Sequence, residues 1–267
     1  GYIEQEKIAI AKKYIIPKSL SKHGLKKNQV RFGQKALSSI AVNYAREAGM
    51  RNYEKMVDKI NRKIATKLVS KAAEPPIKVD GEELEEYLGK PIFREDVKKQ
   101  AAVPGTAVGL AWTNFGGDTL VIEAVHNPGK EGFRLTGQMG KVMQESASIA
   151  YTYARHIAAE LGIDAEYFEK NQIHLHIPAG ATPKDGPSAG ITMTAALLSL
   201  ATAKKLKADF AMTGELSLVG NVLPIGGLKE KVIAARRNKL KHIIIPKQNE
   251  RDLEEIPEKI RKGLSFH

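Results

Sequence analysis

Residues 172–190 constrain the fold of this chain more than any other stretch. They read Gln-Ile-His-Leu-His-Ile-Pro-Ala-Gly-Ala-Thr-Pro-Lys-Asp-Gly-Pro-Ser-Ala-Gly. The alternation of apolar residues at its start predicts a strand over 172–177, and the glycines and prolines that follow predict a loop. An apolar, alanine-rich run from Ser188 to about Ala203 then predicts a helix. Ser188 is therefore expected where the loop meets the helix.

Ser188 has two interpretations at this point. A serine at the start of a helix is commonly an N-cap residue. From the local pattern alone the N-cap is the favoured interpretation. The alternative is a nucleophile, because the unpaired N–H groups of a helix start can hold an oxyanion. Residues 186–190 also fit G-x-S-x-G, the nucleophile elbow of α/β-hydrolases. That motif needs an acid and then a histidine after the serine, and only His242 and His267 follow Ser188.

His174 and His176 alternate with apolar residues on the predicted strand. This spacing puts both rings on one face of the strand, as in some zinc sites. No third ligand is evident nearby in the sequence, so we expect no metal site. We expect these histidines to have structural or active-site-supporting roles.

Three blocks of sequence resemble the proteolytic domain of the Lon family of ATP-dependent proteases. They are HLHIPAGATPKDGPSAG at 174–190, MTGELSLVGNVLPIGGLKEK at 212–231 and IIIPKQNERDLEEIP at 243–257. The resemblance implies a serine endopeptidase of the endopeptidase La type, in which Ser188 and Lys231 form a catalytic Ser-Lys dyad. It also implies an α/β proteolytic domain of Lon type, similar to domain 2 of ribosomal protein S5.

The chemistry is consistent with that pairing, because a serine hydroxyl is a weak nucleophile that needs an adjacent base. A lysine with its ordinary pKa of about 10.4 is almost wholly protonated near neutral pH. Burial lowers that value, and a pKa near 8 would leave roughly a quarter of the lysine neutral at about pH 7.5. A helix is predicted over 228–238, but Lys229 and Lys231 both border its apolar arc. Only the resemblance selects Lys231.

The resemblance also implies three polar residues near the site. Glu123 corresponds to a family glutamate near the active site, Asp185 could gate or hydrogen-bond near the serine, and Thr213 corresponds to a threonine that contacts the catalytic lysine. The residues themselves allow simpler interpretations. These are an exposed strand end for Glu123, a turn-forming aspartate before glycine for Asp185, and an ordinary strand threonine for Thr213.

Residues 1–90 predict a small helical bundle. The expected helices cover 3–16 (ending at Pro17), 19–25, 34–48, 52–69 and 81–88, with short strands at 30–32 and 77–79. The segments KKYIIPKSL and NYAREAGMRNYEKMV resemble the small helical subdomain of the Lon AAA+ module. This implies that Arg51 is the sensor-2 arginine that reaches the ATP phosphates, whereas its local pattern suggests a surface arginine at a helix start. Arg46 is expected to be a surface or interface charge.

The fold class expected for the whole chain is α+β, with the helical bundle at 1–90, a linker at 91–103 and the α/β proteolytic domain at 104–267. In that last domain, strands are predicted at 106–113, 119–125, 133–136, 172–177, 242–246 and 264–266, and a strand with a turn is predicted over 210–219. Helices are predicted at 137–161, 165–170, 188–203 and 228–238, with short helical pieces at 251–255 and 257–261. Because family members usually continue further, we expect the C-terminus to be truncated.

Several classes of function are excluded by what the sequence lacks. The absence of cysteine excludes disulfides, thiolate metal sites and cysteine nucleophiles. No apolar run is long enough to span a membrane, no signal-peptide pattern is present, and no P-loop motif occurs. Because no P-loop occurs, we expect the ATPase core to lie outside this chain and the chain to have no cofactor of its own. Gly1 in place of an initiator methionine predicts a cut or processed fragment.

The resemblance implies ATP and Mg in the full-length protein, a homohexameric ring, and substrates that are unfolded or damaged proteins. It predicts a bacterial cytoplasmic location, with the mitochondrial matrix as the alternative.

The net charge of +12 is concentrated in the first third of the chain. Residues 1–90 hold 19 lysines and arginines against 11 acidic residues. This excess indicates either a solvated helical surface or contact with nucleic acid, so DNA is a possible partner. Two further classes of function thus stay open beside Lon-type proteolysis: nucleic-acid binding, and a serine hydrolase with a histidine base.

Overall fold

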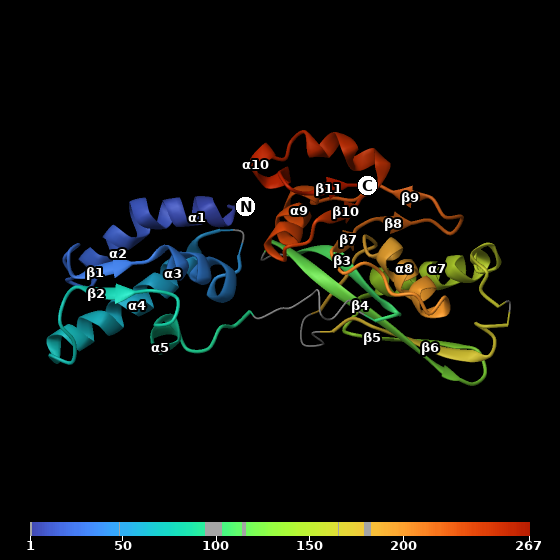
Figure 1. The fold of residues 1–267 in the computed structure, drawn as a ribbon, viewed down its shortest axis with the longest axis horizontal. Coiled ribbons are helices and arrows are strands. Elements are labelled where there is room, and N and C mark those ends of the chain that lie inside the picture. The colour runs from blue at the N-terminus through green and yellow to red at the C-terminus, as the bar shows by residue number, and fades with distance from the viewer. Residues whose placement is uncertain (1, 48, 94–102, 114–115, 165, 179–182) are drawn as a thin grey trace. The chain divides into compact units, whose positions relative to one another are not determined.

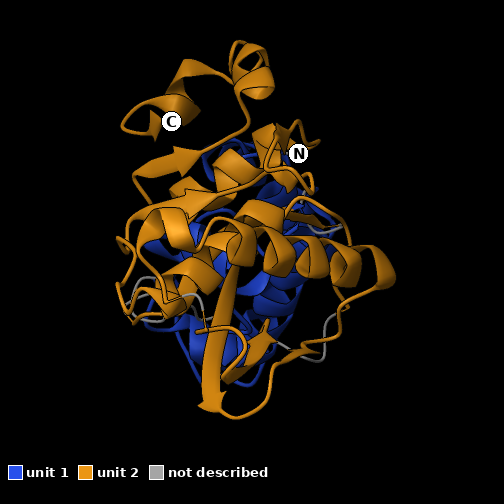
Figure 2. Cartoon of the chain, turned by 90° about the vertical axis from the view of Figure 1, so that its right-hand side faces the viewer, with its two compact units in different colours: residues 1–95, 114–116 blue, residues 96–113, 117–267 orange. Residues whose placement is uncertain are grey.

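The chain divides into two compact units (Figure 2), the first formed by residues 1–95 with 114–116 and the second by 96–113 with 117–267. The computed structural model describes residues 2–47, 49–93, 103–113, 116–164, 166–178 and 183–267. Most of the predicted linker at 91–103 lies outside these residues. Each unit has its own buried apolar core. Helices come first and a mixed sheet with helices follows (Figure 1), which confirms the predicted α+β class.

The first unit is a helical bundle with one small parallel sheet. Its helices are α1 (Glu4–Ile10), α2 (Ile16–Lys22), α3 (Gln34–Ser39), α4 (Arg51–Val69) and α5 (Leu84–Leu88), with π-helical segments η1 (Ala11–Ile15) and η2 (Ile40–Tyr44). Its strands are β1 (Val30–Phe32) and β2 (Ile77–Val79).

The first predicted helix does not stop at Pro17, so that prediction was wrong. The chain stays helical from α1 through η1 into α2. Proline lacks an N–H and its ring clashes with the carbonyl four residues earlier. The π-turn of η1 immediately precedes it, and Ile16 N bonds Ala11 O, five residues back. This wider turn provides room for the ring without ending the helix.

The helix predicted over 34–48 ends at Tyr44, within η2. Ala45 leaves the helical conformation, with φ −127° and ψ 55°. The buried Lys7 ammonium then donates to the carbonyl groups of Ala45 and Glu47. Glu47 Oε1 accepts from Asn52 N at 2.5 Å and from Tyr53 N at 3.0 Å. The segment before α4 therefore caps that helix, and local periodicity could not have revealed this.

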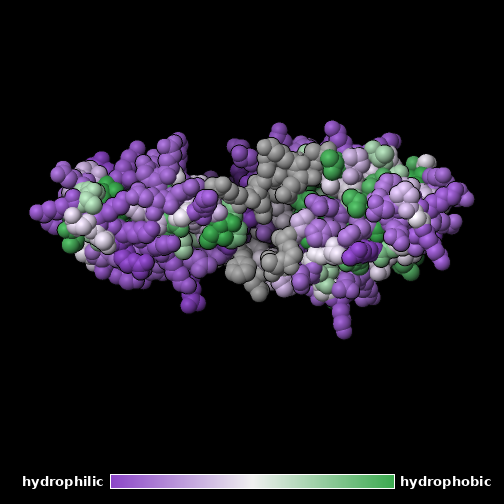
Figure 3. Space-filling view, turned by 90° about the horizontal axis from the view of Figure 1, so that it is seen from below, coloured by the Kyte–Doolittle hydropathy of each residue, from purple (hydrophilic) through white to green (hydrophobic). Residues whose placement is uncertain are grey.

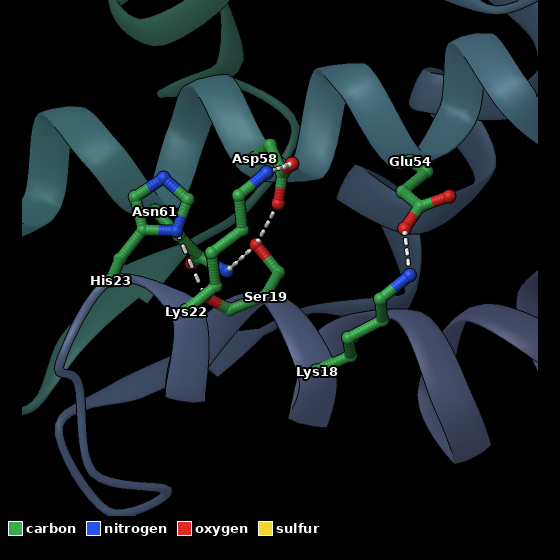
Figure 4. Close-up of polar contacts among 7 residues, drawn as sticks. All are labelled: Lys18, Ser19, Lys22, His23, Glu54, Asp58 and Asn61. Carbon is green, nitrogen blue, oxygen red and sulfur yellow. Dashed lines mark hydrogen bonds and ion pairs between the residues drawn. The ribbon is translucent and has the colours of Figure 1, made fainter.

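A polar cluster joins α2 to α4 inside the first unit (Figure 4). Ser19 Oγ donates to Asp58 Oδ1 at 2.6 Å and accepts from Asn61 Nδ2 at 2.9 Å. Lys22 Nζ reaches the other Asp58 oxygen at 2.6 Å. Burial by itself would raise the pKa of Asp58, but the hydrogen bonds from Lys22 and Ser19 outweigh it and lower that pKa. The cluster thus holds α2 against α4 by hydrogen bonds, while the Oδ1 atom of Asn61 is buried without a hydrogen-bond partner among the described residues.

The face of the first unit seen in Figure 3 is largely hydrophilic. Several of its lysines are paired within the chain, as in Lys18–Glu54, Lys22–Asp58 and Lys67–Glu86. Such pairs between exposed groups contribute little stability, but they neutralise part of the basic excess. In the part of the chain that the structure describes, no helix is long and apolar enough to cross a membrane.

The second unit is built on a seven-stranded sheet with the order β11-β10-β7-β3-β4-β6-β5. These strands are β3 (Thr106–Thr113), β4 (Gly116–Pro128), β5 (Gly132–Thr136), β6 (Asn171–His176), β7 (Phe210–Met212), β10 (His242–Ile244) and β11 (Ser265–Phe266). A separate hairpin joins β8 (Glu215–Leu216) to β9 (Val222–Leu223). The helices are α7 (Lys141–His156), η3 (Ala159–Leu161), α8 (Gly190–Ala201), α9 (Leu228–Arg237), η4 (Lys247–Leu253) and α10 (Glu258–Arg261).

The core of the second unit lies between the sheet and the pair α7–α8 (Figure 1). Ile173 and Leu175 of β6 are buried in the same core cluster as Met193 and Ala196 of α8. The alternate residues of β6 lie on the other face of the sheet. Two predictions here were wrong. The helix predicted over 137–161 is confined to α7 and η3, and the described residues of 165–170 form turns rather than a helix.

Candidate active site

Ser188 lies in the loop between β6 and α8, and it is not the N-cap of α8. The N-cap is Ala189, and no side chain caps the helix. The N-cap interpretation of Ser188 is therefore wrong. Within the described residues, the main-chain N–H groups of Ser188 and Ala189 have no hydrogen-bond acceptor. Donors of this kind beside a serine hydroxyl can stabilise an oxyanion.

The loop before Ser188 is attached to the start of α7. Lys184 O accepts from Gly140 N at 2.7 Å, and Asp185 Oδ1 accepts from Met143 N at 2.9 Å. Asp185 thus caps α7, and it also accepts from Gly186 N at 2.9 Å. A Cβ atom on Gly140 would lie 2.3 Å from Asp185 Cγ, so this approach requires glycine. Asp185 therefore holds the loop that carries the serine.

Two further residues hold this loop, and sequence reasoning missed both. The Ser146 hydroxyl of α7 donates to Pro187 O at 3.3 Å. The Lys184 ammonium donates to Gly137 O at 3.1 Å, and burial lowers its pKa. Ser146 is one serine among several on an amphipathic helix, so its sequence context carried no signal. The close approach of Gly140 was equally invisible, because glycines before helices are common.

Lys231 lies on α9 with its side chain inside the unit, only 2% exposed. Burial lowers the pKa of Lys231 to about 8. Lys229, which a helical wheel could not distinguish from it, is exposed. Of the two lysines, only Lys231 therefore has its side chain inside the unit.

Thr213 joins the lysine to the serine segment. Its hydroxyl is fully buried and accepts from Lys231 Nζ at 3.0 Å. The same hydroxyl donates to Ser188 O at 3.3 Å, and Gly214 N donates to that carbonyl at 2.9 Å. The hydrogen bonds of the described residues therefore connect Lys231 to Ser188 through Thr213 and not directly. Catalytic hydrogen bonds often tighten only when substrate is in place.

The other predicted supporting residues form a second group, on the face of the sheet away from α7 and α8. Thr136 Oγ1 lies 2.8 Å from His174 Nε2 and 2.7 Å from His176 Nδ1. Glu123 lies opposite His176 in the register of β4 and β6. It lies in the middle of β4 and not at a strand end, as was expected. No hydrogen bond among the described residues links Glu123 or either histidine to Ser188 or Lys231.

The two arginines singled out in the first unit differ from one another. Arg51 is the first residue of α4 and is exposed. Arg46 is 9% exposed, and its guanidinium lies 4.8 Å from the centre of the Phe93 ring. The surface alternative for Arg46 was therefore wrong, whereas the interface alternative stays a prediction. Stacking on an aromatic ring compensates part of the cost of burying the guanidinium.

This arrangement can carry out acyl transfer. A serine beside amides that have no acceptor among the described residues is chemically suited to be a nucleophile with an oxyanion site, and a buried lysine with a pKa of about 8 is suited to be a base near neutral pH. Among the described residues, no group of three or more histidine, cysteine or acidic residues could hold a metal ion.

Comparison with known proteins gives two family matches. The Lon protease (S16) C-terminal proteolytic domain matches residues 78–267, and the Lon protease AAA+ ATPase lid domain matches residues 21–77. The whole chain is 56% identical to Lon protease of Treponema pallidum and covers 31% of that protein. It is 53% identical to Lon protease 1 of Borreliella burgdorferi and covers 33% of it. The chain thus spans about a third of the length of the curated relatives it matches.

Proposed function

We propose, from the premise that this chain belongs to the Lon protease family, that it carries the peptide-cleaving centre of an ATP-dependent serine endopeptidase. Ser188 is the nucleophile and Lys231 is the general base. The observation that supports this assignment best is the burial of Lys231 against Thr213, whose hydroxyl also bonds the main chain of Ser188. A buried lysine without a carboxylate partner is costly to a fold, and a base poised near neutral pH gives it a purpose.

The proposed reaction proceeds by acylation and deacylation. Ser188 Oγ turns toward Lys231, transfers its proton to the neutral amine and attacks the scissile carbonyl carbon. The N–H groups of Ser188 and Ala189 hold the resulting oxyanion. The protonated lysine then donates its proton to the leaving amine. Lys231 next activates a water molecule, which hydrolyses the acyl-enzyme and releases the second product.

Thr213 has a specific part in this scheme. Its hydroxyl accepts from Lys231 Nζ in the structure, and it can keep that bond when the lysine changes charge. It therefore holds the amine in place through the proton transfers. Asp185 acts through the serine loop that it attaches to α7. A role in supporting the active site remains a prediction for Glu123, His174 and His176. A role in sensing nucleotide likewise remains a prediction for Arg51.

The wider setting is also a proposal. The relatives named above are Lon proteases of bacteria, and this supports a bacterial cytoplasmic location, substrates that are unfolded or damaged proteins, and assembly into a homohexamer. The match to an AAA+ lid domain supports dependence on ATP and Mg. DNA binding by the basic helical unit stays a prediction.

Hydrolysis of an unstructured fluorogenic peptide near pH 8 tests the dyad. Ser188→Ala and Lys231→Ala should each abolish cleavage, because one removes the nucleophile and the other its base. Lys229→Ala is the matched control, since Lys229 lies two residues away on the same helix but is exposed; it should cleave like the wild type. Full activity in Lys231→Ala would refute the mechanism and favour a histidine-dependent hydrolase.

A further inference from the structure

Helix α9, which carries Lys231, lies directly against the main chain of β4. A Cβ atom placed on Gly117 would lie 1.8 Å from Glu230 O and 3.1 Å from Lys231 N. No other residue could occupy position 117 unless α9 or β4 moved. The peptide that joins Glu230 to Lys231 is therefore seated on β4 at a distance that only glycine permits.

The same short segment of β4 holds the far end of α9. Arg237 Nη2 donates to Gly117 O at 3.0 Å and to Asp118 Oδ1 at 3.1 Å. Asp118 Oδ1 also accepts from Thr119 N at 3.0 Å, which orients the carboxylate. Residues 230 and 237 are seven apart, so they lie on one face of the helix two turns apart. Gly117 and Asp118 thus contact α9 both beside Lys231 and at its last residue.

The ion pair between Arg237 and Asp118 fixes the position of α9 more than it stabilises the fold. The side chains of Arg237 and Asp118 are 18% and 33% exposed, and ion pairs near the surface are worth little by themselves. Two hydrogen bonds from one guanidinium, however, fix direction as well as distance. Removing them would leave the helix folded but free to shift along β4.

We propose that Gly117 and the Asp118–Arg237 ion pair are positioning elements, which fix the depth at which Lys231 lies inside the unit. The proposal rests on the role of Lys231 proposed above, but it concerns the environment of the lysine and not the reaction itself. It adds three residues that have no hydrogen bond to Ser188 among the described residues, yet govern whether the lysine can act as a base.

The expected consequence is a change in the ionisation of Lys231. Burial is the cause of its lowered pKa, so a helix that shifts and admits water should let that pKa rise toward its ordinary value. Charged residues occur on its own helix and on β4, η4 and α10, which pack near α9, but none of them contributes to the shift. They are Asp118, Glu123, Lys229, Glu230, Arg236, Arg237, Lys247, Glu250, Arg251, Asp252, Glu258, Lys259 and Arg261.

The test is an NMR titration of the 267-residue chain with ¹³C-labelled lysine side chains. The Lys231 signal is identified by its absence from Lys231→Met. In the wild type it should titrate near pH 8, and in Arg237→Met its midpoint should rise by about one unit or more. Arg236→Met is the matched control, because the neighbouring Arg236 bonds Ile260 O and Lys262 O instead; its midpoint should stay at the wild-type value.

Further variants separate positioning from a loss of folding. Arg237→Lys keeps the charge but replaces the planar guanidinium, whose Nη2 atom makes both hydrogen bonds, with an ammonium of different shape and reach, so it should give an intermediate midpoint. Asp118→Asn is the milder variant to use if Arg237→Met does not fold. Gly117→Ala should raise the midpoint as well. A folded Arg237→Met or Asp118→Asn with a wild-type midpoint would overturn the proposal.

The titration does not depend on peptide cleavage, so it stands even if the dyad assignment fails. Activity then gives an independent second readout. If Lys231 is the base, the midpoint of the pH–rate profile should move upward in Arg237→Met together with the NMR midpoint. Full cleavage by Lys231→Ala would instead refute the dyad and leave the titration result intact.

Discussion

Replacing Lys231 with methionine should stabilise the second unit near neutral pH and do so less at alkaline pH. The folded-state pKa of Lys231 is about 8, below the ordinary value of 10.5. The unfolded chain therefore binds more protons between these two values, and wild-type stability rises with pH across that window. Below pH 8 the full cost of burying the amine is present. At 1.36 kcal/mol per pKa unit, that cost is about 3 kcal/mol.

Methionine fills a similar volume without a charge, but it gives up the hydrogen bond to Thr213, which is worth about 1 kcal/mol. The expected net gain for Lys231→Met is therefore about 2 kcal/mol at about pH 7. By about pH 9.5 most of the wild-type penalty has been relieved, and the gain should fall by about 2 kcal/mol, to near zero.

Urea unfolding followed by tryptophan emission suits this measurement, because Trp112 is the single tryptophan of the chain and belongs to the second unit. Wild type, Lys231→Met and the exposed-site control Lys229→Met would be compared at pH 7 and at pH 9.5. Lys229→Met should stay within about 0.5 kcal/mol of wild type at both values. A gain for Lys231→Met that is absent at pH 7, or equal at the two pH values, would refute the argument that the lysine is buried at a cost.

Two other predictions follow from the same site. Because only neutral Lys231 can accept the serine proton, kcat/KM for peptide hydrolysis should rise about tenfold per pH unit below pH 8 and level off above it; a profile with its midpoint near the ordinary histidine pKa would contradict this. Gly140→Ala should force Asp185 away from α7 and destabilise the second unit by about 1–3 kcal/mol, which the same urea assay would measure. Gly129→Ala is the control, because its Cβ would lie 3.8 Å from the Gln172 side chain. This control should have a much smaller effect.

The local elements of the site could be predicted well from sequence, because each is set by short-range pattern. The strand before the serine loop, helix α9 and the strand β10 all lie within a residue or two of their predicted ranges. The errors fall where a distant group decides a boundary. Helix α3 with η2 ends early where Lys7 binds the carbonyl groups beyond it, and Pro17 is tolerated because a π-turn precedes it.

The chemistry of the site could be named only through the resemblance to a known family. The choice of Lys231 over Lys229 depends on which face of α9 is turned inward, and that face is set by contacts with β3, β4 and Thr213. None of these segments lies within ten residues of Lys231 in the sequence. A helical pattern carries no information about its partners, so local reasoning left both lysines equivalent.

The same reasoning explains why the sequence around Gly117, Asp118 and Arg237 predicts no contact between them. A glycine pair before an aspartate predicts a loop, and an arginine in the last turn of a helix is favoured by the helix dipole. Both readings are locally sufficient, so nothing in either segment demands a partner. The fold brings Gly117 and Asp118 next to Arg237, which follows them by more than a hundred residues in the sequence. These contacts lie beside Lys231, whose pKa is lowered by burial. The base and the contacts that position it are therefore products of the tertiary fold, and substitutions far from Ser188 in sequence should alter the ionisation of Lys231 as strongly as substitutions beside it.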